Sequence, residues 1–380
     1  MWPLAQIENH VNCRRKMPLF WSKDCRSGPA ATLPFAFASA SESACVSACV
    51  SASQVAAKPL LQSIPRWLAA TFLIAIFTPA HAEIIAIPAA HLGEGKTLRA
   101  QFFAPESKTE TPRAAVILLH GCGGLGANGK LNARHTMWKD WLNERGFIVV
   151  FPESFTSRGV DEVCTQKFSA RTIKRADRVN DVIATRQWLA ARKDVDASKL
   201  VLWGWSHGGG TTLATITHRV GNAFPDDVKF ARAISFYPGC SSYVPSARAQ
   251  KISSPLTLLI GEADDWTPAA PCSQWVQQLR DYKQDATITL FPGAFHDFDN
   301  PGGKLRVRTD VPNGVNPGKG VTTGPDPKAR EAAMQQIDAL FLRTGLTIQR
   351  DAAANSTKTP TVDSETPKSL TPRTAVSAPK

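Results

Sequence analysis

Residues 199–214 read KLVLWGWSHGGGTTLA: an apolar run, a serine between glycines, and a segment that can continue as a helix. A buried strand that enters a tight turn and then a helix is the context that a G-x-S-x-G nucleophile elbow requires. Glycine at 204 and 208 removes Cβ atoms that would collide in such a turn, so the side chain of Ser206 stands above the edge of the sheet. Ser206 is therefore the first candidate nucleophile, and the alternative is an ordinary glycine-rich turn.

Outward from this segment, apolar runs alternate with amphipathic segments. Strands are predicted at 97–103, 114–119, 147–151, 199–203, 231–236, 256–260 and 287–291. Helices are predicted directly after Ser206 and at 135–145, 170–192, 272–282 and 327–342. Uninterrupted apolar runs are typical of strands buried on both faces. The alternation predicts an α/β fold, a mostly parallel twisted sheet with helices on both faces, in a single domain from 83 to 346.

The stretch from 297 to 326 is rich in Gly, Pro and Asn and has no periodic pattern. Loops of this length inside a compact domain are usually functional or disordered. We therefore expect a long ordered loop beside the active site.

Both ends of the chain differ from the middle. Residues 1–57 contain many Ala, Ser, Pro and Cys without helical or strand periodicity, and we expect an unstructured extension there. Residues 347–380 consist mainly of Thr, Pro, Ser, Ala and Lys, and we expect a disordered tail.

Residues 58–82 have the layout of a secretory signal peptide: a basic start, an apolar run at 67–77 and the small-x-small sequence Ala80-His81-Ala82. This predicts cleavage after Ala82 and a periplasmic or secreted protein. Because a membrane-spanning helix needs about 20 apolar residues, we expect no permanent membrane anchor. Signal peptides work at the N-terminus, so the true translation start is expected downstream of Met1, with residues before about Val55 a mis-called extension.

The formal net charge of +12 raises the question of nucleic-acid binding. Lys and Arg are dispersed, however, and the one tight basic run, at 14–16, lies in the expected extension. We therefore expect no nucleic-acid partner. The eight His residues are scattered and no Cys pair outside the extension has zinc-ligand spacing, so we expect no metal and no cofactor. The oligomeric state stays open.

A serine nucleophile needs a base and an acid that orients the base. Asp264 follows the predicted strand that ends at Ile260, and His296 follows the strand that ends at Phe291. In an open parallel sheet, functional groups gather at the carboxyl ends of the strands. The order Ser206, Asp264, His296 is the order of the triad in α/β-hydrolases, so we predict this fold and this triad.

A second glycine-rich segment, at 120–124, follows the predicted strand that ends at Leu119. Its sequence, HGCGG, stands where esterases carry an oxyanion loop of the H-G-G-G type. We expect the backbone N–H groups of His207 and of Cys122, or a neighbour of Cys122, to face the developing oxyanion. The alternative is a plain glycine-rich strand end.

Five motifs together resemble the dienelactone hydrolase family of α/β-hydrolases, over most of 97–345. They are LLHGCGGL at 118–125, PESF at 152–155, GWSHGG at 204–209, GEAD at 261–264 with Pro268, and FPGAFHDF at 291–298. The family spacing from Gly261 and to Pro268 selects Asp264 as the acid and leaves Asp265 to cap the following turn or helix.

The enzymes that open dienelactones carry a Cys nucleophile and a Glu after the third strand, where this chain has Ser206 and roughly Gly121. The resemblance therefore implies the esterase-like branch with a Ser nucleophile. The expected activity is that of a carboxylic-ester hydrolase acting on a small-molecule ester, lactone or thioester. The alternatives are a serine peptidase of the prolyl-oligopeptidase type and a hydrolase-fold binding protein without catalysis.

Four cysteines remain in the mature chain, and an even number in an exported protein is more often paired than free. Cys240 and Cys272 each lie in a loop after a neighbouring strand on the catalytic side, so we predict a disulfide between them. Cys122 with Cys164 is the companion pair, and small buried thiols are the alternative.

Overall fold

The computed structural model describes residues 83–107, 109–126 and 130–347, which all belong to one compact unit of the chain. The expected extension at 1–57, the expected signal peptide at 58–82 and nearly all of the expected C-terminal tail lie outside the described residues. Within the described part, no helix has the length and apolar composition needed to cross a membrane.

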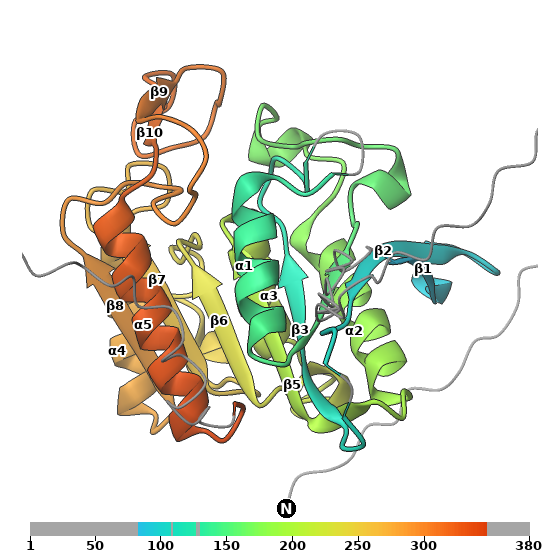
Figure 1. Cartoon of the computed structure of the whole chain (residues 1–380). Helices are drawn as coiled ribbons and strands as arrows, with labels where there is room; N and C mark the ends of the chain where they lie inside the picture. Colours follow the sequence, from blue (N-terminus) through green and yellow to red (C-terminus); the bar gives the residue numbers. More distant parts are fainter. Residues whose placement is uncertain (1–82, 108, 127–129, 348–380) are drawn as a thin grey trace, which may run out of the picture. The chain divides into compact units, whose positions relative to one another are not determined.

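Eight strands form one mixed sheet in the order β1-β2-β4-β3-β5-β6-β7-β8 (Figure 1). The strands are β1 Glu83–Pro88, β2 Thr97–Phe103, β3 Arg113–Leu119, β4 Ile148–Pro152, β5 Val195–Trp205, β6 Arg232–Phe236, β7 Leu256–Gly261 and β8 Ala286–Phe291. β1, β2 and β4 pair antiparallel, and the six strands from β3 to β8 pair parallel. This is the α/β-hydrolase fold that the sequence predicts, with β5 in the middle of the parallel part.

Helices cover both faces of this sheet. They are α1 Ala133–Glu144, α2 Arg175–Ala190, α3 His207–Ile216, α4 Ala269–Asp281 and α5 Pro327–Arg343. The 3-10 helices are Ala90–Leu92, Thr156–Arg158, Phe168–Ala170, Asp226–Val228 and Ala247–Gln250. In Figure 1, α1 and α5 lie in front of the sheet and α2 and α3 behind it. Parallel strands sandwiched in this way need apolar side chains on both faces.

β5 shows how these residue types form these layers. On one face Trp203 packs against Trp138 of α1, with ring centroids 4.7 Å apart, and stacks on Phe236 of β6 at 5.5 Å. On the other face Leu200 and Leu202 pack in a cluster with apolar residues of α2. All are fully buried, and each such side chain contributes about 1.5–3 kcal/mol through removal from water. The strand that carries Ser206 is thus among the most firmly packed parts of the sheet.

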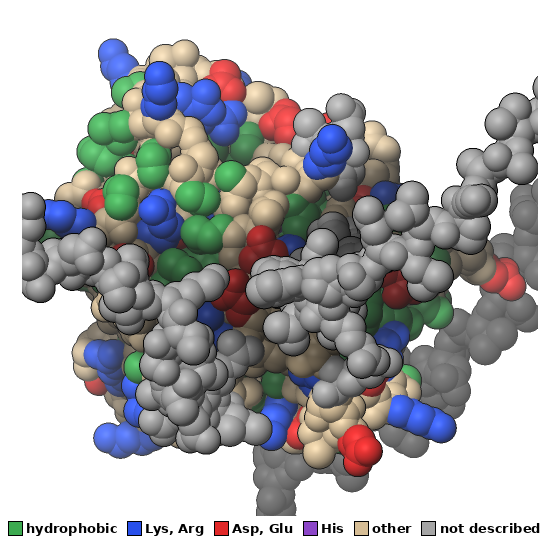
Figure 2. All heavy atoms as spheres, viewed as in Figure 1, with side chains coloured by type: hydrophobic (Ala, Val, Ile, Leu, Met, Phe, Trp, Pro, Cys, Tyr) green, Lys and Arg blue, Asp and Glu red, His purple; other side chains and the backbone are tan. Residues whose placement is uncertain are grey.

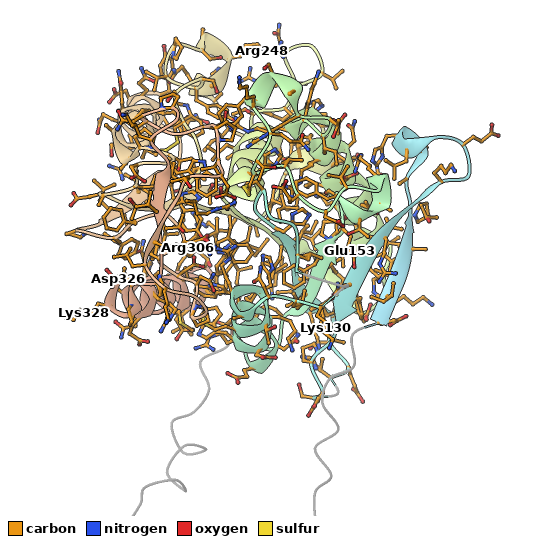
Figure 3. The ribbon with its side chains drawn as sticks, turned by 90° about the horizontal axis from the view of Figure 1, so that it is seen from above. Lys130, Glu153, Arg248, Arg306, Asp326 and Lys328 are labelled. Atoms are coloured by element: carbon orange, nitrogen blue, oxygen red, sulfur yellow. A yellow bond between two sulfur atoms is a disulfide. The ribbon has the colours of Figure 1, made fainter. Side chains whose placement is uncertain are left out.

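The ends of β4 and β2 are joined by a buried carboxylate of the PESF motif. Glu153 accepts hydrogen bonds from the side chains of Arg99 and Gln101, each at 2.9 Å. Figure 3 shows the labelled Glu153 beside the antiparallel strands. The motif thus fixes the antiparallel edge to the parallel part of the sheet.

The prediction of one long loop at 297–326 is wrong in part, because this stretch contains a hairpin of β9 Arg306–Arg308 and β10 Val321–Thr323. Three residues per strand are too few for a period of two to be visible. Figure 2 shows apolar side chains gathered on the region that β9 and β10 occupy in Figure 1, and the exposed apolar residues of this segment include Leu305, Val307 and Val315.

The ends of several elements also differ from the prediction by a few residues, and β1 and α2 show the clearest differences. β1, next to the expected cleavage site, was not predicted. α2 begins at Arg175 and not at 170, because the backbone amide of Lys174 donates to the Asp177 carboxylate at 2.7 Å and caps the helix there.

Both predicted disulfides are present: Cys122 with Cys164, and Cys240 with Cys272. Their Cα atoms are 4.9 and 5.0 Å apart, within the ordinary range for a disulfide.

Candidate active site

Ser206 lies in a strained turn between β5 and α3. Its backbone has φ 52° and ψ −112°, a region that residues with a Cβ avoid. The turn is held by a hydrogen bond from the Ser206 amide to the carbonyl oxygen of Phe236, at 3.0 Å. A Cβ at Gly204 would collide with the backbone of Gly208, and one at Gly208 with the carbonyl oxygen of Leu119. The two glycines therefore permit the sharp turn that presents Ser206 at the sheet edge.

The ends of β7 and β8 bring an acid and a histidine together. Nδ1 of His296 lies 2.8 Å from Oδ2 of Asp264, and both side chains are buried. The other oxygen of Asp264 accepts the backbone amides of Trp266 and Thr267 at 2.9 and 2.8 Å. Because these amides fix the carboxylate, Asp264 also fixes the orientation of the imidazole ring.

Thr267 is a member of this cluster that the sequence analysis missed. Its hydroxyl lies 3.1 Å from both Oδ2 of Asp264 and Nδ1 of His296, and 2.9 Å from the carbonyl oxygen of Tyr237. With acceptors on this side, the ring carries its proton on Nδ1 and leaves Nε2 unprotonated. No motif identified Thr267, which stands three residues after the acid.

His296 and Ser206 line one cavity, and the second ring nitrogen of this histidine is not bound by the acid. Among the described residues, Nε2 of His296 has no hydrogen-bond partner. Both residues line a cavity of 140 Å³. Burial lowers the pKa of His296, but the charge and hydrogen bond of Asp264 outweigh it, and the pKa is raised above its ordinary value. The imidazole can thus accept a proton and is stabilised when it carries one.

The second glycine-rich segment lies directly against the elbow. A Cβ built on Gly121 would be 3.6 Å from Cβ of Ser206. Cys122, the next residue, lines the same cavity as Ser206, and its carbonyl oxygen accepts the amide of Val163 at 2.8 Å. His207 is the first residue of α3, and first-turn amides have no acceptor within their own helix. The two expected oxyanion donors therefore flank the serine.

A buried carboxylate joins the serine strand to the histidine loop. Oδ2 of Asp299 accepts the indole N–H groups of Trp138 and Trp205, each at 2.8 Å, and Oδ1 accepts the hydroxyl of Tyr237 at 2.5 Å. Trp205 directly precedes Ser206 in the chain, so Asp299 fixes that strand end relative to the loop of His296. The residues in contact are up to 161 positions apart in the sequence, and no sequence motif indicates these contacts.

Asp265 does not cap the following helix, contrary to our expectation. Its carboxylate accepts the amide and hydroxyl of Thr322 in β10 at 2.7 and 2.8 Å. The turn after the acid is instead capped by Asp264 itself, and α4 begins at Ala269, after Pro268, without a side-chain cap. Asp265 therefore anchors the β9–β10 hairpin near the site.

Comparison with known families and solved structures agrees with this arrangement of residues. The model of the dienelactone hydrolase family matches residues 98–344. The chain belongs to the dienelactone hydrolase family. A dienelactone hydrolase-like promiscuous phosphotriesterase from metagenomic libraries superposes with a TM-score of 0.52 at 19% identity, covering 70% of this chain and 99% of that one. Esterase 2 of Thermogutta terrifontis, in a butyrate-bound structure, gives 0.51 at 16% identity, covering 71% and 96%. At these identities the likeness concerns the fold.

Curated relatives of this dienelactone hydrolase family member include peptidases. Acylamino-acid-releasing enzyme 2 of Oryza sativa is 22% identical over 254 residues, which are 56% of this chain and 31% of that protein. A dipeptidyl-aminopeptidase B of Sclerotinia sclerotiorum is 31% identical over 113 residues, 28% and 12% of the two chains. The chain spans only 5 to 31% of the length of the curated relatives it matches.

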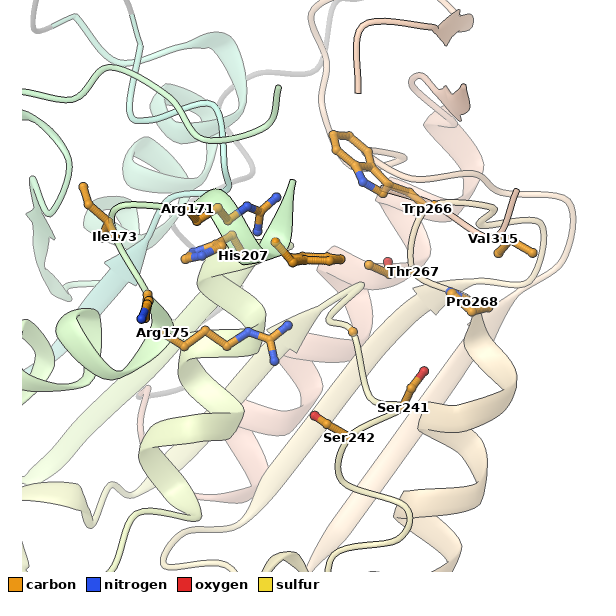
Figure 4. Close-up of a pocket in the computed structure, with 14 residues that line it drawn as sticks. Arg171, Ile173, Arg175, His207, Ser241, Ser242, Trp266, Thr267, Pro268 and Val315 are labelled. Carbon is orange, nitrogen blue, oxygen red and sulfur yellow. The ribbon is translucent and has the colours of Figure 1, made fainter. Parts of the chain in front are cut away.

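A cavity of 600 Å³ opens beside the serine of this family member, with apolar and basic walls. In Figure 4, Arg171 and Arg175 lie on one side of it, and Trp266 and Val315 on the opposite side. A smaller cavity of 50 Å³, lined by Ser206, shares Arg171, Arg175 and Trp266 with it. No Asp or Glu is among the described residues that line either one.

The arginines of this cavity have no carboxylate within ion-pair distance among the described residues. Arg171 is 9% exposed, its Nε has no hydrogen-bond partner within the described chain, and burial, then repulsion from Arg175, lowers its pKa to about 10. Neither arginine forms an ion pair with a described carboxylate. The cavity can therefore accept a negatively charged group. Within the same described part, no group of three or more His, Cys, Asp or Glu side chains is placed to hold a metal ion.

Proposed function

We propose that the chain is an exported serine hydrolase that cleaves a carboxylic ester, lactone or thioester through an acyl-enzyme. The observation that carries the proposal is the pairing of Nδ1 of His296 with Asp264, in a histidine that lines the same cavity as Ser206 and whose Nε2 has no partner among the described residues. Membership of a hydrolase family and the oxyanion loop beside the serine support it.

In this mechanism Nε2 of His296 takes the hydroxyl proton as Oγ of Ser206 bonds to the carbonyl carbon. The electron pair of the carbonyl moves to its oxygen, which the amides of Cys122 and His207 would face. The C–O or C–S bond to the leaving group then breaks, and the imidazolium gives its proton to that group. Water repeats the sequence on the acyl-enzyme and releases the acid. Asp264 stabilises the imidazolium and holds its orientation.

A fluorophosphonate probe tests this proposal before a natural substrate is known. We expect stoichiometric labelling of Ser206, located by peptide mass spectrometry, and hydrolysis of at least one member of a panel of activated short-chain esters, lactones and thioesters. An unlabelled protein would favour the alternative of a hydrolase-fold binding protein without catalysis.

The pH dependence provides an independent prediction. Protonated His296 cannot accept the serine proton, so activity is lost at low pH. Burial lowers the pKa of this histidine, as does Arg134 to a smaller extent, but Asp264 and Asp297 together outweigh them, so the pKa is raised. We therefore expect kcat/KM to rise with pH through an apparent pKa above the ordinary value of about 6.5. A midpoint below that value in a pH-rate profile would contradict the assignment of His296 as base.

A serine peptidase is the second candidate, because curated peptidases match part of the chain. An enzyme that binds a free amino terminus needs negative charge to pair with the ammonium group. The cavity beside Ser206 offers Arg171, Lys174 and Arg175 instead. Its charge favours a substrate with an anionic group over one with a cationic terminus.

The positive charge of the cavity predicts a preference for substrates with an anionic group, and replacing its arginines should remove this preference. Replacing Arg171 or Arg175 by Gln should raise KM for a carboxylate-bearing ester about 10- to 100-fold, because a hydrogen bond to a charged group contributes about 1.5–3 kcal/mol. KM for the matched neutral methyl ester should change less than about threefold. Equal changes in KM for the two substrates would show that the anionic group of the substrate binds outside this cavity.

We also propose that residues 58–82 direct export with cleavage after Ala82 and that 83–346 is the hydrolase domain. The two disulfides support an oxidising compartment, since such bonds persist there. Amino-terminal sequencing of the native protein tests the cleavage site, because the mature chain should begin at Glu83.

A further inference from the structure

One arginine of α2 contacts both segments that flank Ser206. Nη2 of Arg178 donates to the carbonyl oxygen of His120 at 3.0 Å, and Nη1 lies 2.8 Å from Nδ1 of His207. His120 begins the loop that carries Cys122, and His207 directly follows Ser206. A single guanidinium therefore joins the loop after β3 to the first turn of α3.

The contact with His207 determines the protonation of that ring. A guanidinium has only donors, so Nδ1 of His207 must accept and the ring must be neutral, with its proton on Nε2. Burial, followed by the charges of Arg178, Arg171 and Arg175, lowers the pKa of His207 well below its ordinary value. The ring therefore stays neutral over the working pH range and keeps its bond to Arg178.

The charge of Arg178 is buried without a carboxylate bound to it. The side chain is 0% exposed, and its Nε has no acceptor within the described part of the chain. Burial lowers the pKa of Arg178 to about 9, which leaves it charged at neutral pH. Asp181, one turn further along α2, is bound to His91 at 2.7 Å and Arg158 at 2.9 Å.

Burial of an unpaired charge opposes folding, so contact energy alone does not explain this arginine. A fixed positive charge beside the reacting centre, however, stabilises negative charge that exists only in the transition state. The ester carbonyl is neutral before attack and becomes an oxyanion during it.

We propose that Arg178 is a positioning residue that holds both sides of the oxyanion hole in register and supplies a fixed positive charge behind it. The inference rests on the proposed function. Arg178 lines none of the three cavities near Ser206, so it would act through the backbone amides of the loop at 120–124 and of His207. Its effect should therefore fall on kcat and leave KM nearly unchanged.

Two variants separate the charge from the bridging contacts. Arg178→Gln removes the charge and keeps one donor, and Arg178→Lys keeps the charge but cannot reach both acceptors. We expect kcat to fall about 10²- to 10³-fold in the Gln variant, the loss typical of a missing oxyanion donor, and about tenfold in the Lys variant. KM should stay within about threefold in both, and the rate of fluorophosphonate labelling should fall in parallel with kcat.

Arg158→Met is the matched control. It removes another arginine cation next to α2, bound to Asp181 and the carbonyl oxygen of Ser154, without a contact to the oxyanion loop. It should lower the melting temperature and leave kcat per folded molecule unchanged.

If Ser206 of the wild type is labelled but kcat of both Arg178 variants stays within twofold of the wild-type value, the proposal for Arg178 is wrong and the proposed function is not affected. A wild-type protein that is not labelled would overturn the proposed function and this proposal with it. If the Gln variant does not fold, the Lys variant decides: a tenfold loss of kcat at constant KM supports bridging, and no loss refutes it. Independently, ¹⁵N chemical shifts of His207 in the wild type should show an unprotonated Nδ1, and a protonated Nδ1 would refute the pairing.

Discussion

Replacing Ser206 by Ala should lower kcat about 10⁶-fold for any ester that the protein hydrolyses. Without the hydroxyl no acyl-enzyme forms, and only the oxyanion hole and substrate binding remain, which sustain a small rate over water. KM should change little, because the hydroxyl contributes little to ground-state binding. Steady-state kinetics on the best ester of the panel measure both constants.

Ser254→Ala is the control for this substitution. Ser254 is buried and precedes β7 at the opposite end of the sheet, where its hydroxyl accepts the amide of Phe230 at 2.8 Å. Its loss should reduce stability and leave kcat unchanged. More than about 1% of wild-type kcat in Ser206→Ala would assign the nucleophile to another residue.

Replacing Asp264 by Asn should lower kcat by a factor on the order of 10⁴ with fold and binding retained. An amide in this place can donate to Nδ1 of His296 and so favour the tautomer that has no free Nε2. The bonds from the amides of Trp266 and Thr267 to the other oxygen can survive, so the turn keeps its shape.

The neighbouring carboxylate is the matched comparison. Asp265→Asn should cost about tenfold or less, because Asp265 contacts Thr322 of the hairpin and not the imidazole. The kinetics of the two variants on one ester decide the matter. The opposite ranking would move the acid to Asp265 and shift the family alignment by one residue.

The sequence predicts the parallel sheet well because the strands at 114–119, 199–203 and 256–260 are buried on both faces and read as apolar runs. It also predicts which residues the carboxyl ends bring together, because chain order and strand position place Ser206, Asp264 and His296 at one edge. The roles of these residues in catalysis stay a prediction until the variants are measured.

The supporting residues could not be predicted in this way. Thr267, Arg178 and Asp299 act through contacts with residues 29 to 161 positions away in the chain. Such contacts depend on how the loops pack against one another and against the sheet, and no local hydrophobic periodicity or motif indicates them. Asp265 is a further example. Its position after the acid predicts a cap on the following turn or helix, but its carboxylate accepts hydrogen bonds from Thr322, which is 57 positions away.

One disulfide begins at Cys122, in the loop that lies beside Ser206, and the other begins at Cys240, in the loop after β6. Each of them closes a long stretch of chain. The separations are 42 residues for Cys122 with Cys164 and 32 for Cys240 with Cys272. A crosslink of this length removes conformational entropy from the unfolded chain worth about 4 kcal/mol in the loop-closure model. A domain's entire stability is only about 5–15 kcal/mol, so a large share of it depends on two bonds that a reducing environment would break. The loop at 120–124 would be among the first segments to lose its restraint, because Cys122 is itself one of the bonded residues.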